Sequence, residues 1–183
     1  MKFTVADNPV GIDIVSLADM KEFLRVDHND EDTTISEIIT SAVMAVQNYT
    51  GRVFNSTTYT MKLDSFHNIE IPTQISSVTG VTYHDTAGLS QTLSTKKYYI
   101  DLSREPARVA FLNTPSIYED MFNAVTISGA VGHQASPPIK HAIKMLAAHY
   151  YENRRAVIVG VKASKIPLGI EAILNPYRII SLV

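Results

Sequence analysis

The spacing of apolar residues changes twice along this 183-residue chain, and this change constrains the fold more than any other feature. From about residue 16 to 50, and again from 136 to 174, apolar residues recur every three to four positions, as in amphipathic helices. Between about 52 and 132 they alternate with polar residues, as in strands buried on one face. We therefore predict an α+β fold in which an antiparallel β module is inserted into a small helical bundle.

Three main helices and a short fourth one are predicted. Ser16 and Asp19 form a capping-box-like start for the first helix. The second ends at Gly51, where a left-handed C-terminal residue is expected. Ser136 is the predicted N-cap of the third, followed by two prolines, and the fourth covers about 168–174. The apolar stripes predicted to pack together are Leu17, Met20, Phe23 and Leu24; Ile35, Ile38, Ile39, Ala42, Val46 and Tyr49; and Ile139, Ala142, Ile143, Leu146, Ala147 and Tyr150.

Six strands are predicted in the middle of the chain, separated by turns rich in Gly, Pro, Asn and Asp. They cover about residues 53–63, 75–84, 89–93, 97–101, 107–112 and 123–131. The domain prediction follows directly. Residues 1–51 and 136–183 form the helical core, residues 52–135 form the inserted β module, and together they make one structural unit.

Charge is divided unevenly along the chain. Residues 1–50 hold three Lys or Arg against nine Asp or Glu, whereas residues 136–183 hold seven against two. The two ends are either solvated surfaces of opposite sign or complementary faces that meet between neighbouring copies. The second interpretation predicts a subunit interface that includes Asp27, Asp30, Asp32, Lys140, Lys144, His149 and Tyr151.

No set of residues has the spacing of a reaction centre or a metal site. The acidic run 27–32 departs from a calcium loop, because Asp32 and Ile38 stand where Gly and Glu are required. His141 and His149 lie eight residues apart, about 12 Å along a helix, which is too far to share a metal ion. The chain has no cysteine, no nucleophile elbow and no glycine-rich phosphate loop. We expect no enzyme activity, no metal and no cofactor.

The composition also bears on the compartment and on membranes. No apolar run approaches the roughly 18 residues of a membrane span, so no membrane partner is expected. The first residues, MKFTVADNPVG, lack the apolar segment of a signal peptide. Together with the absence of cysteine, this predicts a protein made in a reducing cytoplasm.

Four segments together resemble the head–tail connector (head-completion adaptor) family of tailed bacteriophages, in its long form with a β insertion. They are residues 24–28 (LRVDH, followed by Asp32 and the pair Ile38-Ile39), 48–52 (NYTGR), 147–154 (AAHYYENR) and 166–174 (IPLGIEAIL, followed by PYR at 176–178). Residues 78–83 and 124–127 resemble the family's β region. In one departure, many relatives carry Gln-Thr-Trp after the Thr-Gly-Arg turn, whereas this chain has Thr57-Thr58-Tyr59 and no tryptophan.

This resemblance implies a structural virion protein of the neck, made in the host cytoplasm. Copies would form a ring on the portal protein, and the bore of the ring would continue the channel for genomic DNA without sequence-specific binding. The far face would receive the next head-completion (stopper) protein or a tail protein. An alternative of another class is a DNA-binding or packaging-accessory domain that uses residues 136–183 as a basic surface.

The C-terminal segment, residues 160–183, is the predicted portal contact. It finishes on four aliphatic residues among five, and such residues are normally covered by something. Either the portal covers them, or the segment folds back onto its own β module. The predicted contact residues are Leu168, Ile173, Leu174, Tyr177, Arg178 and Ile180.

Overall fold

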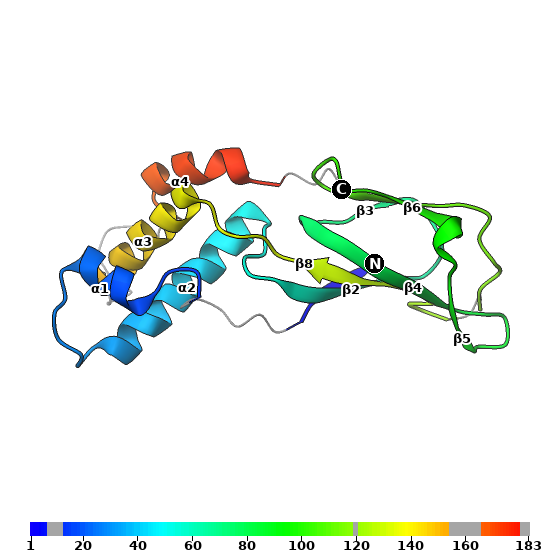
Figure 1. Cartoon of the computed structure of the whole chain (residues 1–183), viewed down its shortest axis with the longest axis horizontal. Helices are drawn as coiled ribbons and strands as arrows, with labels where there is room; N and C mark the ends of the chain where they lie inside the picture. Colours follow the sequence, from blue (N-terminus) through cyan, green and yellow to red (C-terminus); the bar gives the residue numbers. More distant parts are fainter. Residues whose placement is uncertain (7–12, 119–120, 154–165, 180–183) are drawn as a thin grey trace, which may run out of the picture. The chain divides into compact units, whose positions relative to one another are not determined.

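The computed structural model describes residues 1–6, 13–118, 121–153 and 166–179 of the chain (Figure 1). The fold is α+β, as predicted, with helices and antiparallel sheets. The chain forms two compact units. The β unit comprises Met1–Asn8, Gly51–His133 and Ile179–Val183, and the helical unit comprises Pro9–Thr50 and Gln134–Arg178.

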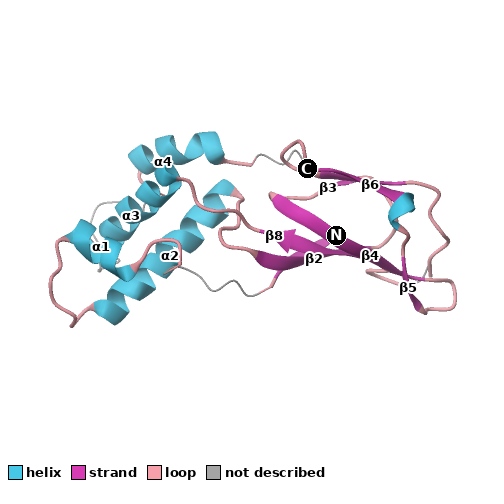
Figure 2. Ribbon diagram, in the orientation of Figure 1, coloured by secondary structure: helices cyan, strands magenta, loops and turns pink. Residues whose placement is uncertain are grey.

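The helical unit contains the four predicted helices (Figure 2). They are α1 (Leu17–Leu24), α2 (Asp32–Thr50), α3 (Pro137–Glu152) and α4 (Leu168–Leu174), followed by the short 3₁₀ helix η2 (Asn175–Tyr177). Helix α2 packs against α1, α3 and α4, and α3 also contacts α1 and α4. The buried core of this unit comprises Ile14, Val15, Met20, Ile35, Ile39, Ala42, Val43, Val46, Ala135, Ile139, Ala142, Ile143, Leu146, Ala147, Ile170 and Leu174. Helices α1, α2 and α3 contact one another. Phe23, expected in the stripe of α1, is 41% exposed.

The helix ends agree with their predicted caps, with one exception. The Ser16 hydroxyl accepts a hydrogen bond from the Asp19 amide at 3.1 Å, and Gly51 after α2 has φ +69°. Ser136 occupies the N-cap position of α3, but its side chain makes no cap hydrogen bond. Pro137 and Pro138 follow it at the first two helical positions, and Pro138 lacks the N–H that such a hydroxyl can accept from at the second position.

The β unit consists of two antiparallel sheets. Five strands lie in the order β1-β2-β8-β4-β5, and three lie in the order β3-β7-β6. The strands are β1 (Lys2–Val5), β2 (Thr57–Leu63), β3 (Ile69–Glu70), β4 (Ile75–His84), β5 (Ser90–Thr92), β6 (Tyr98–Asp101), β7 (Arg108–Phe111) and β8 (Val125–Val131), with a 3₁₀ turn, η1 (Thr95–Lys97), before β6. All six predicted strands are present.

Two strands were not predicted, and one begins later than expected. Strand β1 pairs with β2, so residues 2–5 belong to a sheet and not to the helical core, where the sequence prediction placed them. Strand β3 is only two residues long, too short for a period to be visible. Strand β2 begins at Thr57 instead of residue 53, because Asn55 has φ +66° and interrupts the extended backbone.

Alternating side chains of both sheets share one apolar core. Along β8 every second residue is fully buried, which is the pattern of a strand with one face in the core. Gly129 of β8 lies opposite Tyr59 of β2 and Val78 of β4. A Cβ atom at Gly129 would lie 2.1 Å from the Ser77 carbonyl oxygen and 2.7 Å from a ring carbon of Tyr59, so the sheet packs there only because glycine has no side chain.

Candidate interaction surfaces

The acidic loop, residues 25–31 between α1 and α2, is an exposed charged feature of the helical unit. Asp27 and Asp30 are both exposed, and the Asp30 side chain retains 94% of its accessible surface. The loop is held from within, because the Lys21 ammonium donates to Asn29 Oδ1 at 2.6 Å and to Asp32 Oδ1 at 2.7 Å. The Asp32 amide also donates to the Asn29 carbonyl at 3.2 Å. The loop is therefore a fixed projection with its carboxylates directed outward.

Two of the residues predicted to form a subunit interface are engaged inside their own unit. Asp32 is ion-paired with Lys21, and the Tyr151 hydroxyl of α3 donates to the Glu31 carboxylate. These contacts attach the acidic loop to α1 and to α3. Asp32 and Tyr151 therefore position the loop, and Asp27 and Asp30 remain as the outward-facing carboxylates.

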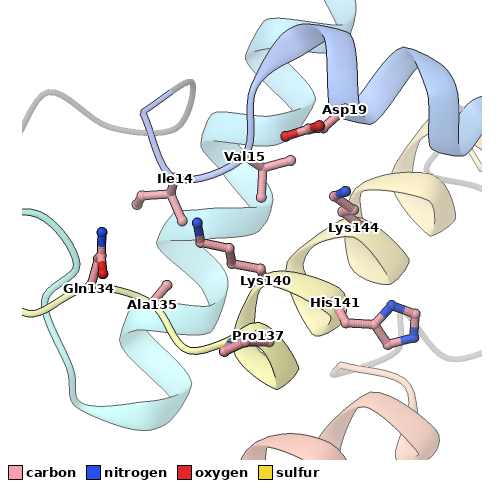
Figure 3. Close-up of a pocket in the computed structure, with 9 residues that line it drawn as sticks. All are labelled: Ile14, Val15, Asp19, Gln134, Ala135, Pro137, Lys140, His141 and Lys144. Atoms are coloured by element: carbon pink, nitrogen blue, oxygen red, sulfur yellow. The ribbon is translucent and has the colours of Figure 1, made fainter.

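A basic pocket of about 400 Å³ lies between the start of α1 and the start of α3 (Figure 3). Lys140 extends toward Ile14 and Val15, Lys144 lies on the side of Asp19, and His141 points away from the segment before α1 (Figure 3). The lining residues are Ile14, Val15, Asp19, Gln134, Ala135, Pro137, Lys140, His141 and Lys144. Lys140 and Lys144 lie one helical turn apart. Neither forms an ion pair with any carboxylate in the described part of the chain. The sequence pattern singled out these lysines but contained no sign of the pocket, which depends on Ile14 and Val15.

His141 and His149 occupy different surroundings along α3. The His141 ring meets the edge of Phe23, with centroids 6.2 Å apart. His149 lies more than two turns beyond Lys140, where the Asn153 amide donates to its backbone carbonyl at 2.9 Å. The predicted interface residues therefore fall into separate groups, and His149 is not part of the basic pocket.

The predicted portal-contact residues have unequal exposure. Leu168 is 83% exposed, and Ile173 and Tyr177 are half-buried. Leu174 is fully buried, so it belongs to the core of the helical unit and not to its exposed surface. Arg178 lies over the Tyr49 ring, 5.4 Å from its centroid, and Ile180 falls outside the described residues.

The end of α2 holds the segment that follows α4. The Tyr49 hydroxyl donates to Asn175 Oδ1 at 2.7 Å, and the same ring accepts the Arg178 guanidinium on its face. Tyr49 therefore holds residues 175–178 at the end of α2. Four of the seven basic residues counted in 136–183, Arg154, Arg155, Lys162 and Lys165, lie outside the described residues.

Sequence reasoning missed several exposed apolar residues on the β unit. Phe122 is 84% exposed, Tyr99 67% and Leu89 62%. Each is a single apolar residue beside a turn or on a strand face, which is ordinary in any sequence. Among the residues that the structure describes, no group of three or more His, Asp or Glu is placed to hold a metal ion. None of the described helices is long and apolar enough to span a membrane.

The exposed features of this fold, a fixed charged loop, a basic pocket and an apolar residue on a short helix, are those of a protein that works by docking. The chain matches the model of the head completion protein family over residues 13–180. It therefore belongs to the head completion protein family. This is a family of structural virion proteins and not an enzyme family, and the role of the chain is that of a head–tail connector or adaptor. The predicted family and structural role are confirmed.

Solved structures with the same fold come from a gene transfer agent (GTA) particle. A chain in the neck of the empty particle, computed with C6 symmetry, matches with a TM-score of 0.76 and 19% identity. Chains in the virion of the native particle and in its neck, computed with C12 symmetry, match with TM-scores of 0.79 and 0.73 at 19% and 18% identity. Each match covers 100% of this chain and 98% of the other. A comparison with curated proteins found no match.

Proposed function

We propose that this protein forms a ring of identical copies in the neck of a phage-like particle. The observation that carries the proposal is the similarity of the whole chain to neck chains solved with C6 and C12 symmetry, together with its family. A closed ring requires a heterologous interface, in which two different patches of each copy meet. The acidic loop and the basic face of α3 are two different patches of opposite charge.

The ring attaches to the portal protein through the segment after residue 160, and its bore continues the DNA channel. Leu168 supports this assignment, because its side chain is 83% exposed and its burial by a partner would stabilise the complex. With Leu174 buried, the contact set reduces to Leu168, Ile173, Tyr177, Arg178 and Ile180. The opposite face of the ring receives a stopper or tail protein. The protein has no catalytic activity and holds no metal or cofactor.

Binding to purified portal tests this proposal. Full-length protein is expected to be retained by immobilised portal, and deletion of residues 176–183 is expected to abolish retention while the circular dichroism spectrum stays unchanged. The matched control is Leu89→Ser, which removes an exposed apolar side chain of the β unit and should leave retention intact. Equal retention of the deletion variant would assign the portal contact to another surface.

Binding of the same protein samples to DNA distinguishes a connector from a DNA-binding domain. A basic surface that binds DNA releases counterions, so its affinity falls steeply as salt rises. A connector that only encloses DNA is expected to show weak binding to double-stranded DNA at physiological salt. Tight binding with a steep salt slope, in the absence of portal binding, would favour the DNA-binding alternative.

A further inference from the structure

The acidic loop and the basic pocket lie at opposite ends of α1. Ile14, Val15 and Asp19 border the pocket at the start of this helix, and the loop begins at Arg25, directly after its end. Eight helical residues span about 12 Å. The loop is also held by Lys21 and, through Glu31, by Tyr151, so it does not reach the pocket of its own copy.

The pocket has the chemistry to receive a short segment that carries carboxylates. Ile14, Val15 and Ala135 give it buried apolar walls, and Lys140 and Lys144 supply two ammonium groups one helical turn apart against one carboxylate in the lining, Asp19. In the part of the chain that the structure describes, neither ammonium has a carboxylate partner. A volume of about 400 Å³ accommodates a few side chains but not a folded element.

The acidic loop has the complementary chemistry. Its two outward carboxylates, on Asp27 and Asp30, are exposed. Among the described residues, the only ion pair formed by either is a 3.9 Å contact between Asp30 and His28, which requires a protonated imidazole. Because internal contacts already hold the loop, little conformational entropy is lost when it docks. A fixed acidic projection and a basic recess on one molecule are the two halves of a head-to-tail contact.

We infer that the acidic loop of one copy inserts into the basic pocket of the next, with Asp27 and Asp30 facing Lys140 and Lys144. This inference rests on the proposed function and names the partner of the pocket as a second copy of this chain. Each copy uses its loop on one neighbour and its pocket on the other, so the contact continues around a ring.

The absence of cysteine from the chain allows a direct test by cross-linking. His28→Cys places a thiol on the loop and Gln134→Cys places one at the pocket, and neither change touches the four charges. When the two single variants are mixed with a short bis-maleimide, a cross-linked dimer is expected. Its yield should exceed the control by on the order of tenfold, because docking raises the local concentration of the thiols. The control replaces Gln134→Cys by Glu37→Cys, an exposed position on α2.

Charge reversal then tests the pairing itself. Lys140→Glu with Lys144→Glu on the pocket partner should reduce the yield to the control level, and so should Asp27→Lys with Asp30→Lys on the loop partner. Combining the two reversed partners should restore the yield. For the wild-type charges, 1 M NaCl should lower the yield, because this is on the order of ten times the salt at which the Debye length is about 10 Å. A yield equal to the control, or no restoration on combining the reversed partners, overturns the inference.

The remaining outcomes separate this inference from the proposed function. If native mass spectrometry shows rings but the loop and pocket do not cross-link, the inference is wrong and the ring stands. A protein that stays monomeric and uncross-linked at every concentration also overturns the inference, and portal binding then decides the proposed function independently. If reversal of Lys140 and Lys144 abolishes salt-sensitive DNA binding and no cross-link forms, the pocket receives phosphate instead of a second copy.

Discussion

Replacing Gly129 by alanine tests the closest backbone approach in the β unit. The added methyl would lie 2.1 Å from the Ser77 carbonyl oxygen and 2.7 Å from Tyr59 Cε1. Overpacking a core typically costs about 1–3 kcal/mol. The Ser77 oxygen belongs to the backbone of the paired strand β4 and cannot rotate away. We therefore expect the free energy of unfolding to fall by at least about 3 kcal/mol, the top of that range.

Thermal unfolding followed by circular dichroism measures this loss. For a chain of this length 1 kcal/mol shifts Tm by about 2–4 °C, so Gly129→Ala should lower Tm by about 6–12 °C. The control is Gly80→Ala in β4, where an added Cβ meets nothing within 4 Å, and the expected change is within about 1 kcal/mol, toward higher stability. If Gly129→Ala melts within a degree of wild type, or changes Tm by no more than Gly80→Ala does, the pairing of β4 with β8 at this position is wrong.

Ile39→Asp puts an unpaired charge at a fully buried site of α2 and should lower the stability by several kcal/mol, enough to unfold the helical unit. Met44→Asp, at a half-exposed site of the same helix, should change Tm little. Equal effects of the two variants in a urea titration would contradict the helix packing. The Tyr59 hydroxyl is buried without a hydrogen-bond partner in the described structure, so Tyr59→Phe should be neutral or stabilise by up to about 1 kcal/mol. Burial raises the pKa of Tyr59, so ionisation favours the unfolded chain: wild-type stability should be complete below the ordinary tyrosine pKa of about 10 and fall as the pH rises above it. Urea midpoints at several pH values should show a smaller alkaline loss for Tyr59→Phe, and parallel curves would refute the assignment. Finally, the chain passes between the two units at several points, so we predict one cooperative unfolding transition by calorimetry; two separated transitions would show that the units fold independently.

Local periodicity determined most of the secondary structure, because burial on one face leaves a period in the sequence itself. The alternation over residues 125–131 predicted β8, and the stripe that includes Ile139 and Leu146 predicted α3. The end of α2 was predictable from Gly51 alone, since a left-handed residue there strongly favours glycine. The family resemblance rested on such local segments as well, which is why it could be identified without a structure.

Only the tertiary structure decided which of the charged and apolar residues face outward. Asp32 pairs with Lys21, eleven residues earlier, and Glu31 bonds to Tyr151, 120 residues later; a local pattern contains no information about such partners. The burial of Leu174 and the pairing of β1 with β2 have the same cause, since both depend on chain segments that are distant in sequence. The basic pocket is the clearest case, because its lysines lie more than a hundred residues after Ile14 and Val15 in sequence and meet them only when α1 and α3 pack together.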